Sequence, residues 1–514
     1  MIERVKGLGL AALAACLLAA CGGNGSSGAS VDASGARGSL IQNPPLRTAS
    51  LTATDLSAQL QSTTSGQQLI LVAGTPTCGI DVHYIQYGTV GGAGEQTTAS
   101  GVLMVPTGTA APCTGPRPVL LYAHGTTTDR AYNLAAIADP NNSASGESGL
   151  VAAMFAAQGY IVVAPNYAGY DSSPLPYHPY LNADQQSNEM IDALTAARKA
   201  IGHVFAAATT DNGKLFVSGY SQGGHVAMAT VRSLQGAGAT VTASAPLSGP
   251  YAMEAFGDAI LFGSVNLGST VFMPLITTSY QKSYGNVYNA TTDIYAVAYA
   301  NGIDSLLPST TPLNTLFAQN LLPQTALFSS TTPVTGNATL DAALAVPGNP
   351  LFALGFGSNN LIINGVRVAY ALDAVASPDG AVPSPQPGVP LAATPMYPLR
   401  QDLKRNDLRN GAWAPTAPML LCGGNADPTV FFSVNAQTMQ AFWAALPVGL
   451  VTVLDVDSAP SGASDPFAAA KLGFAQAKAQ TFAAGGQNAV VQAYHGSLVP
   501  PFCAAAARGF FSQF

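Results

Sequence analysis

Charged side chains are scarce in this chain of 514 residues. Asp, Glu, Lys and Arg make up 9% of it, whereas hydrophobic residues make up 48%. A disordered chain has the opposite balance, so the composition predicts a large folded protein. The formal net charge is −7, whereas proteins that bind nucleic acid usually carry a basic surface. We therefore expect no nucleic acid partner.

Sequence patterns for metal binding are also missing. No Cys-x-x-Cys pair and no Cys/His cluster with the spacing of a zinc site occurs. Beyond the N-terminus, no run of residues is long and apolar enough to span a bilayer. We expect neither a metal nor another cofactor.

The N-terminus has the pattern of an export signal. Arg4 and Lys6 precede an apolar run over residues 7–17, and a small-residue LAAC tetrad ends at Cys21. The tetrad resembles the bacterial lipobox, in which the cysteine is lipidated. An identical tetrad ends at Cys16, but it would leave a very short apolar region. We predict a signal peptide over residues 1–20 and a lipid anchor on Cys21.

The anchor predicts where the protein acts. Gly22, and not Asp, follows Cys21, which resembles the pattern of outer-membrane lipoproteins. We expect an exported bacterial protein that is lipid-anchored in the outer membrane; ordinary cleavage, giving a secreted protein, is the alternative. Residues 21–50 are rich in Gly, Ser and Ala and predict a flexible tether. The oligomeric state is not predicted.

Four further cysteines follow the predicted anchor. In an exported protein they suggest two disulfides. They form one early and one late group in the sequence. We therefore predict the pairs Cys78–Cys113 and Cys422–Cys503.

Short apolar runs separated by turn residues begin at about residue 69. QQLILVAG, IDVHYIQYGTV and TTASGVLMVP predict strands that lead into a larger sheet, with His83 on a strand surface. From residue 119 onward, apolar strands alternate with helical patterns. This alternation predicts an α/β fold over residues 51–249, a mostly parallel sheet with helices on both faces.

The alternation stops at about residue 250. Residues 250–410 are rich in Asn, Thr, Pro and Gly and show only short helical patches. Strand and helix patterns then return over residues 411–514, beginning with the strand APMLLCGG. We predict that residues 250–410 form a cap inserted before this strand.

Residues 214–236 (KLFVSGYSQGGHVAMATVRSLQG) predict a strand, a sharp turn and a helix. This sequence of elements is typical of a nucleophile elbow, in which a strained turn lifts a serine hydroxyl above the sheet edge. Gly219 and Gly223 flank Ser221, and a Cβ at either position would collide across the bend. Ser221 is the candidate nucleophile.

A serine hydroxyl needs an imidazole to take its proton. Only His225 and His495 follow Ser221 in the chain. His225 lies four residues beyond the serine on the same predicted helix, so we expect a structural role for it. His495, in a loop-like setting before Gly496, is the candidate base.

The imidazole needs an acid that fixes its tautomer, and the acid should follow a strand of the resumed sheet. Asp427 follows the strand APMLLCGG, in a turn closed by Pro428. Asp455 and Asp457, at the end of GLVTVLDVD, are its competitors. We favour Asp427.

A tetrahedral intermediate needs two backbone N–H donors for its oxyanion. Gln222, directly after the nucleophile, should supply one. Thr126, in the loop after the strand that ends near His124, should supply the other, because Gly125 lets the backbone approach closely. We expect His124 to anchor this loop.

Five motifs together resemble the α/β-hydrolase superfamily, and within it the secretory lipases of the lipase A type. The resemblance covers roughly residues 70–510 and is weakest over the cap; the motifs are YAHGT, VVAPNYAGY, GYSQG, GGNADPTV and YHG. It implies Ser221, Asp427 and His495 as a catalytic triad. One departure is Asn166, where such chains often carry Asp.

The expected activity is that of a serine carboxylic ester hydrolase, an esterase or lipase. Its substrate would be a small-molecule, lipid or polyester ester with an apolar acyl or aryl group. A serine peptidase or an acyltransferase on the same scaffold is an alternative. A catalytically silent, lipid-tethered ligand-binding protein is another, although all three triad residues are present.

Overall fold

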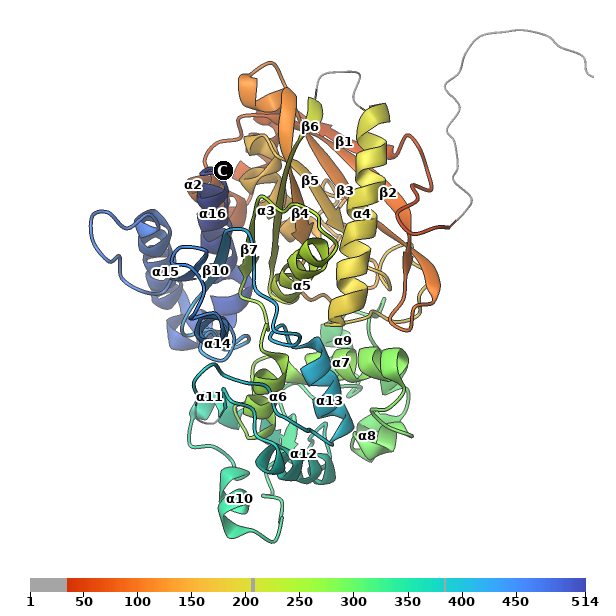
Figure 1. Ribbon diagram of the computed structural model, residues 1–514, viewed down its shortest axis with the longest axis vertical. Coiled ribbons are helices and arrows are strands. Elements are labelled where there is room, and N and C mark those ends of the chain that lie inside the picture. The colour runs from red at the N-terminus through yellow and green to blue at the C-terminus, as the bar shows by residue number, and fades with distance from the viewer. Residues whose placement is uncertain (1–34, 205–208, 383–384) are drawn as a thin grey trace, which may run out of the picture.

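We describe a computed structural model of the chain, which places residues 35–204, 209–382 and 385–514 (Figure 1). The predicted signal peptide, residues 1–20, and the predicted lipidation site Cys21 lie outside the described residues. Among the described helices, none has the length and apolarity needed to cross a membrane. The same residues contain no group of three or more His, Cys, Asp or Glu side chains able to hold a metal ion.

The core is a nine-stranded sheet in the order β1-β2-β3-β5-β4-β6-β7-β10-β11. The pairs from β1 to β5 are antiparallel, and those from β5 to β11 are parallel. The strand bounds are β1 Leu46–Leu51, β2 Gly79–Val90, β3 Gln96–Thr107, β4 Gly115–Ala123, β5 Ile161–Pro165, β6 Thr209–Tyr220, β7 Ala243–Leu247, β10 Met419–Gly423 and β11 Val451–Asp455. The predicted mostly parallel α/β fold is confirmed.

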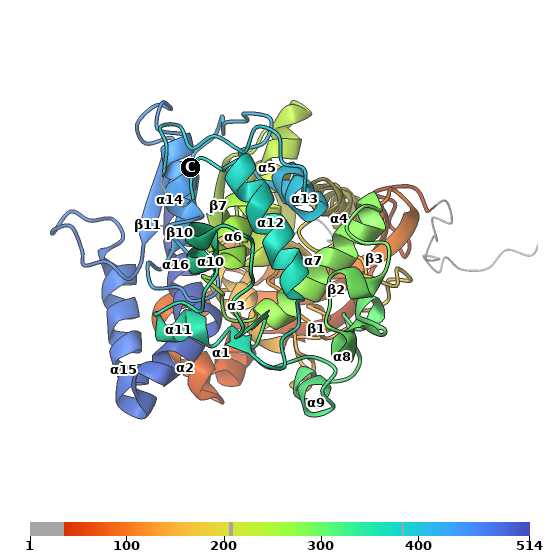
Figure 2. The same cartoon turned by 90° about the horizontal axis from the view of Figure 1, so that it is seen from below.

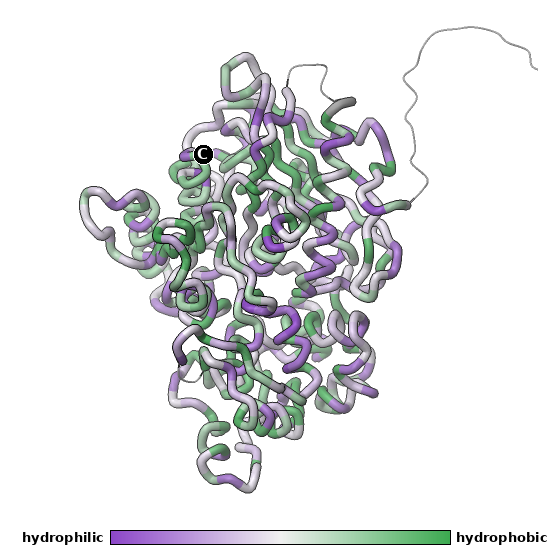
Figure 3. Tube along the Cα trace, in the orientation of Figure 1, coloured by the Kyte–Doolittle hydropathy of each residue, from purple (hydrophilic) through white to green (hydrophobic). Residues whose placement is uncertain are grey.

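Helices cover both faces of this sheet (Figures 1 and 2). On one side, α4 (Ala183–Val204) and α5 (Gln222–Gly236) contact each other and the central strands. On the other side, α2 (Thr64–Ala73), α3 (Ser145–Met154) and α16 (Val499–Phe511) pack together. Strands covered on both faces read as continuous apolar runs, and Figure 3 shows hydrophobic residues concentrated along them.

The first predicted strand, QQLILVAG, is wrong. These residues lie in α2, whose N-terminus is capped by the Thr63 side chain accepting from the Gly66 N–H. The helix packs against α1 (Ala53–Gln61) and α16. A short apolar run fits a strand and a buried helix equally well, and here the cap and the neighbouring helices select the helix.

The edge of the sheet extends further toward the N-terminus than predicted. Residues 37–50, expected to belong to a flexible tether, instead form bridges to β2 from Arg37 and Leu40 and then the strand β1. Leu40 is buried. His83 on β2 is 4% exposed and pairs with Arg47 on β1, so the predicted surface position is wrong. This strand was not predicted because the polar composition before residue 50 is typical of a flexible segment.

The segment between β7 and β10 is helical and lies at the carboxyl ends of the parallel strands (Figure 1). It has a hydrophobic core of its own, separate from that of the sheet. We call residues 250–410 the cap. Its helices are α6 Met253–Leu261, α7 Ser269–Tyr284, α8 Val297–Ala300, α9 Leu313–Ala318, α10 Ala338–Ala343, α11 Pro350–Ala353, α12 Asn364–Ala376 and α13 Pro398–Asn406, with the short strands β8 Phe328–Ser329 and β9 Phe356–Gly357.

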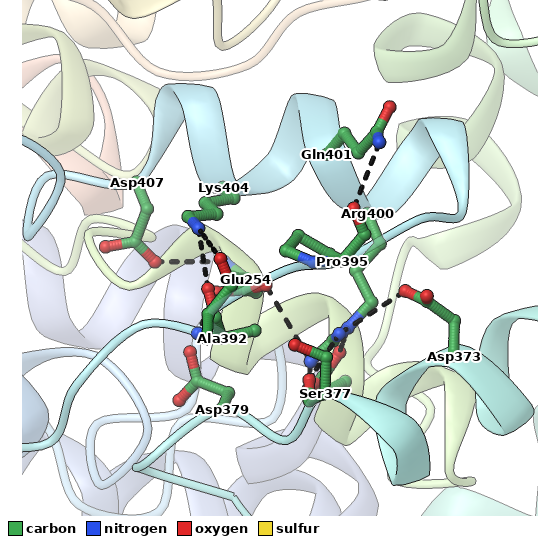
Figure 4. Close-up of polar contacts among 12 residues, drawn as sticks. Glu254, Asp373, Ser377, Asp379, Ala392, Pro395, Arg400, Gln401, Lys404 and Asp407 are labelled. Atoms are coloured by element: carbon green, nitrogen blue, oxygen red, sulfur yellow. Dashed lines mark hydrogen bonds and ion pairs between the residues drawn. The ribbon is translucent and has the colours of Figure 1, made fainter.

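A buried ionic cluster joins three helices of the cap (Figure 4). The Arg400 guanidinium on α13 lies 2.8 Å from Asp258 and 3.7 Å from Glu254, both on α6. It also lies 3.4 Å from Asp373 on α12. Planar guanidinium donors suit several carboxylates at once, so Arg400 connects these helices inside the cap.

The two predicted disulfides, Cys78–Cys113 and Cys422–Cys503, are both present. The second joins β10 to α16. It therefore links the strand before Asp427 to the helix after His495.

Replacing Arg400 by Ala should lower the free energy of unfolding by about 3–5 kcal/mol, because it leaves buried carboxylates without their cation. Urea unfolding followed by circular dichroism measures the effect. Arg47→Ala is the control, since Arg47 pairs with Asp81 at the surface and should cost about 1 kcal/mol or less. Equal losses in the two variants would contradict the role given to the cluster.

The stability of the cap should fall as the pH rises through neutrality. Burial raises the pKa of Glu254 from 4.5 to about 8, because Arg400 offsets only part of the desolvation. The folded state therefore keeps a proton that the unfolded chain loses, and this contribution to stability disappears between about pH 4.5 and pH 8. Urea unfolding at pH 5, 7 and 9 should show a decline in the wild type that is reduced in Glu254→Gln. Parallel pH profiles would count against this assignment.

Candidate active site

Ser221 lies in a strained turn between β6 and α5. Its backbone has φ 59° and ψ −122°, a conformation that L-residues rarely adopt. A Cβ on Gly219 would come within 2.3 Å of the Gly223 carbonyl oxygen, and a Cβ on Gly223 within 2.0 Å of the Ala123 carbonyl oxygen. The steric collision that the sequence predicted for a Cβ at either position is therefore present in the structure. The Ser221 N–H donates to the carbonyl of Leu247 at 2.9 Å, which ties the turn to β7.

The structure brings together the three residues expected to form a triad. His495 Nε2 lies 2.8 Å from Ser221 Oγ, and His495 Nδ1 lies 2.6 Å from Asp427 Oδ2. A carboxylate only accepts, so Nδ1 carries the proton and Nε2 is left to accept from the serine hydroxyl. This arrangement can activate a nucleophile.

The Asp427 carboxylate is held by its own loop. Its Oδ1 accepts from the N–H groups of Thr429 at 2.8 Å and Val430 at 3.1 Å, and the residue is buried. The carboxylate is therefore oriented toward His495 before any substrate arrives.

The sequence suggested a loop around His495, but the structure places this residue elsewhere. It occupies a π-helical turn, Tyr494–Leu498, between α15 (Ala468–Ala493) and α16. Turns of this kind are often found at functional sites. The Tyr220 hydroxyl donates to the His495 carbonyl at 2.6 Å, so the residue before the nucleophile fixes the base.

The two competing carboxylates have other partners. Asp455 accepts from the Asn425 side chain at 2.6 Å, and Asp457 accepts from the Tyr494 hydroxyl at 2.7 Å and from Lys478 at 2.6 Å. In the described part of the chain, neither bonds to the imidazole. They instead hold the acid loop and the residue next to the base.

His225 and His124 have the structural positions that the sequence suggested. His225 is buried, with Nε2 2.9 Å from the carbonyl of Asn406, and burial lowers its pKa to about 4. His124 is buried, and Tyr132 and Tyr167 stack on it at 4.5 Å and 4.0 Å between ring centroids. Burial lowers its pKa too. Neither lies in the hydrogen-bond chain of Ser221.

Asn166, the departure from the family pattern, is a second support of the same loop region. Its side chain accepts from the Leu134 N–H at 2.8 Å and donates to Ser100 at 2.9 Å. Its carbonyl lies 3.1 Å from His124 Nε2. An amide can donate and accept here at the same time, which a carboxylate cannot.

The two residues expected to supply oxyanion donors, Thr126 and Gln222, line a cavity together with Ser221. The Gln222 N–H belongs to the first turn of α5, where no helical acceptor exists. Among the described residues, none accepts from the Thr126 N–H. The Gln222 side chain donates to His178 Nε2 at 2.7 Å, while His178 Nδ1 donates to the Ala168 carbonyl at 2.9 Å. Burial lowers the pKa of His178 to about 3, so the ring stays neutral and accepts.

Two cavities meet at Ser221. The first, which we call the cap cavity, has a volume of about 90 Å³ and includes Thr126 and Gln222 in its wall. The second, the histidine cavity, has a volume of about 370 Å³ and includes Thr126 and His495. The cap cavity is mostly lined by apolar side chains, among them Met253, Phe256, Ile260, Phe272, Met273 and Ile276.

Three residues of the site were not found from the sequence: Glu147, His178 and Tyr220. Glu147 lines the histidine cavity, and the other two contact Gln222 and His495 as described above. Tyr220 lies inside the elbow pentapeptide, directly before Ser221, and this position was the one sequence signal that could have marked it as part of the site. For Glu147 and His178, no spacing relates them to Ser221, because only the fold brings them near it.

Comparison with known proteins supports an enzyme of the hydrolase class. The model of the prolyl oligopeptidase family (Peptidase_S9) matches residues 147–273, which is well under half of the chain. No curated protein sequence matches the chain.

Several solved structures share the architecture. The ligand-bound rice cell wall degrading esterase LipA from Xanthomonas oryzae is 26% identical, with a TM-score of 0.66, and the match covers 93% of this chain and 100% of that one. Another LipA structure is 29% identical over 85% of this chain and 95% of that one, with a TM-score of 0.61. A putative hydrolase from Legionella pneumophila, 19% identical, matches 91% of this chain and 96% of its own with a TM-score of 0.59; it shows the fold alone.

The elbow, the sheet order and these esterase structures agree with one another. Together they support a hydrolase of the ester-cleaving type. The chain has the α/β-hydrolase fold and resembles bacterial esterases that share this fold.

Proposed function

We propose that the protein is a serine carboxylic ester hydrolase that works through an acyl-enzyme on Ser221. The observation that carries this proposal is the hydrogen-bond chain from Ser221 through His495 to Asp427, at 2.8 Å and 2.6 Å. Two backbone N–H groups, of Thr126 and Gln222, lie beside the same serine. Nucleophile, base, acid and oxyanion donors are the parts that acyl transfer needs.

In the first half of the reaction, Ser221 Oγ attacks the ester carbonyl and His495 Nε2 takes the serine proton. The oxyanion of the tetrahedral intermediate accepts from the Thr126 and Gln222 N–H groups. His495 then gives its proton to the departing alcohol oxygen, leaving the acyl group on Ser221. Water, deprotonated by His495, releases the acid in the second half. Asp427 stabilises the imidazolium in both halves.

From the position of His495 we infer which cavity holds which part of an ester. The alcohol oxygen must face His495 to receive a proton, so the alcohol part belongs in the histidine cavity. The acyl chain then belongs in the cap cavity, whose wall includes both oxyanion residues but not His495. Because that wall is apolar, it suits an apolar acyl or aryl group.

A serine peptidase is the second candidate, because the matching family model is that of prolyl oligopeptidases. The matched residues 147–273 contain the nucleophile elbow and its flanking elements, which hydrolases of many specificities share. The LipA esterase, whose structure matches nearly the whole chain, favours ester cleavage over peptide cleavage. The name of that enzyme also makes plant cell wall esters reasonable test substrates.

We also propose that the enzyme acts outside the cytoplasm, lipid-anchored through Cys21. The two disulfides support export, since such bonds persist in oxidising compartments. Labelling of the expressed protein with an alkyne-tagged fatty acid, with Cys21→Ala as the comparison, tests the anchor.

Replacing Ser221 by Ala should reduce kcat/KM on p-nitrophenyl butyrate by roughly 10⁴-fold or more, because the nucleophile is lost. A fluorophosphonate should label the wild type on the peptide that contains Ser221, as read by mass spectrometry, and abolish its activity. Ser512→Ala, an exposed serine at the end of α16, is the matched control and should behave as the wild type. Cleavage of peptide anilides but not of esters by the wild type would favour the peptidase instead.

Narrowing the cap cavity should change acyl preference. Ile276→Trp replaces an aliphatic side chain in its wall by a larger indole ring. It should reduce kcat/KM for p-nitrophenyl octanoate by about tenfold or more, because pockets discriminate between substrates by size on this scale. The acetate ester should be little affected. Val375→Trp, on the exposed surface of α12, is the control. An equal loss on both esters would contradict the assignment of this cavity to the acyl chain.

A further inference from the structure

Glu147, in the first turn of α3, is bonded to the loop that carries the candidate oxyanion donor. Its Oε1 accepts from the Gly125 N–H at 3.1 Å and from the Tyr122 hydroxyl at 2.9 Å. Its Oε2 accepts from the Tyr132 hydroxyl at 2.8 Å. Burial raises the pKa of both tyrosines well above 10, so their hydroxyls keep their protons and donate. Three donors from residues 122–132 therefore converge on one carboxylate.

These contacts fix the peptide group that joins His124 to Gly125. The C=O of His124 accepts from the Tyr167 hydroxyl at 3.0 Å, and the N–H of Gly125 donates to Glu147. A trans peptide is planar, with its C=O and N–H pointing in opposite directions. Because it is held at both ends, this peptide cannot rotate without losing a hydrogen bond to a largely buried group.

The next peptide group, from Gly125 to Thr126, is held at one end only. Its carbonyl lies 2.6 Å from His124 Nδ1, while the Thr126 N–H at its other end has no acceptor among the described residues. Planarity directs that N–H away from the His124 ring. Glycine between the two planes would otherwise allow broad rotation. The direction of the Thr126 N–H thus depends on how firmly the preceding plane is held.

We propose that Glu147 is a positioning residue for ester hydrolysis: by holding the Gly125 N–H, it aims the Thr126 N–H at the oxyanion of the tetrahedral intermediate. This inference rests on the proposed serine ester hydrolase function. Glu147 itself transfers no proton and forms no bond to the acyl group. Each oxygen of its carboxylate accepts from at least one neutral donor.

The position also explains why a charged side chain is tolerated in the wall of the histidine cavity. An unpaired carboxylate next to a developing oxyanion would oppose catalysis by charge repulsion. A carboxylate that accepts three hydrogen bonds is instead satisfied by its donors, and its bond to the Gly125 N–H is stronger than a bond between neutral groups. Glutamine can accept from the same N–H, but more weakly, and alanine cannot accept at all.

Glu147→Ala should lower kcat on p-nitrophenyl butyrate by about 10- to 100-fold, since loss of one whole oxyanion donor costs about 10²- to 10³-fold. KM should change by less than about threefold, because the ground-state ester makes little use of the oxyanion donors. Glu147→Gln should recover most of kcat, because its side-chain oxygen still accepts from the Gly125 N–H.

Affinity for an alkyl trifluoromethyl ketone gives the readout that a loss of folding would not mimic. Its adduct with Ser221 places an oxyanion between the two N–H groups, so its inhibition constant should rise in Glu147→Ala by the same factor as kcat/KM falls. Glu95→Ala is the matched control. Glu95 also accepts from a tyrosine hydroxyl (Tyr177, 2.7 Å) and from a backbone N–H (Ala93, 2.8 Å), but it lies in the β2–β3 turn.

The outcomes distinguish a failure of the positioning role of Glu147 from a failure of the proposed ester hydrolase function. A wild-type protein without esterase activity would overturn both. An active wild type whose Glu147→Ala variant keeps kcat within twofold, or loses kcat with no change in ketone affinity, would overturn the positioning role alone. Circular dichroism at the assay temperature establishes that each variant is folded. If Glu147→Ala is not folded, Glu147→Gln and Tyr132→Phe are compared with the wild type instead, for both kcat and ketone affinity.

Discussion

The site depends on how closely two backbone segments of the chain approach each other at the elbow. Gly223 leaves room for the Ala123 carbonyl, which lies on the strand that runs directly into the oxyanion loop. Ser221 is left in a positive-φ conformation that costs of the order of 1–3 kcal/mol. The surrounding sheet opposes relaxation of this strain, since the Ser221 N–H is bonded to β7. This contact brings the proposed nucleophile close to the loop of the proposed oxyanion donor Thr126.

The remaining parts come from distant places in the sequence and are fastened by specific links. The proposed base lies 274 residues beyond the proposed nucleophile, and the proposed acid lies 68 residues before the base. The disulfide between Cys422 and Cys503 joins the strand before Asp427 to the helix after His495. Tyr494 adds a second link, since its hydroxyl contacts both Asp457 and the N–H of Ala426. A small displacement of either segment is thereby resisted on both sides.

Residues that act through local backbone geometry could be predicted from the sequence. The elbow glycines have a steric reason that follows from their spacing, and the strand before Asp427 is a continuous apolar run. Two of the failures have clear physical causes. QQLILVAG became a helix because its cap and its neighbouring helices outweighed its β-compatible composition. Glu147 and His178 carry no local pattern, because their partners are set by how α3 and the loop before α4 pack around the sheet.

One helix of the cap has two different faces. On α6, Met253, Phe256 and Ile260 line the cap cavity, whereas Glu254 and Asp258 face Arg400. Residues three or four apart share a helix face, and none of these three lies at that spacing from Glu254 or Asp258, although Gly257 and Leu261, which also line the cavity, do. Mutation can therefore alter the shape of the cavity without touching the ionic contacts that hold the helix in place. Such a division would let related enzymes diverge in the esters they accept while keeping one scaffold, and it makes the apolar face of α6 a natural starting point for directed evolution.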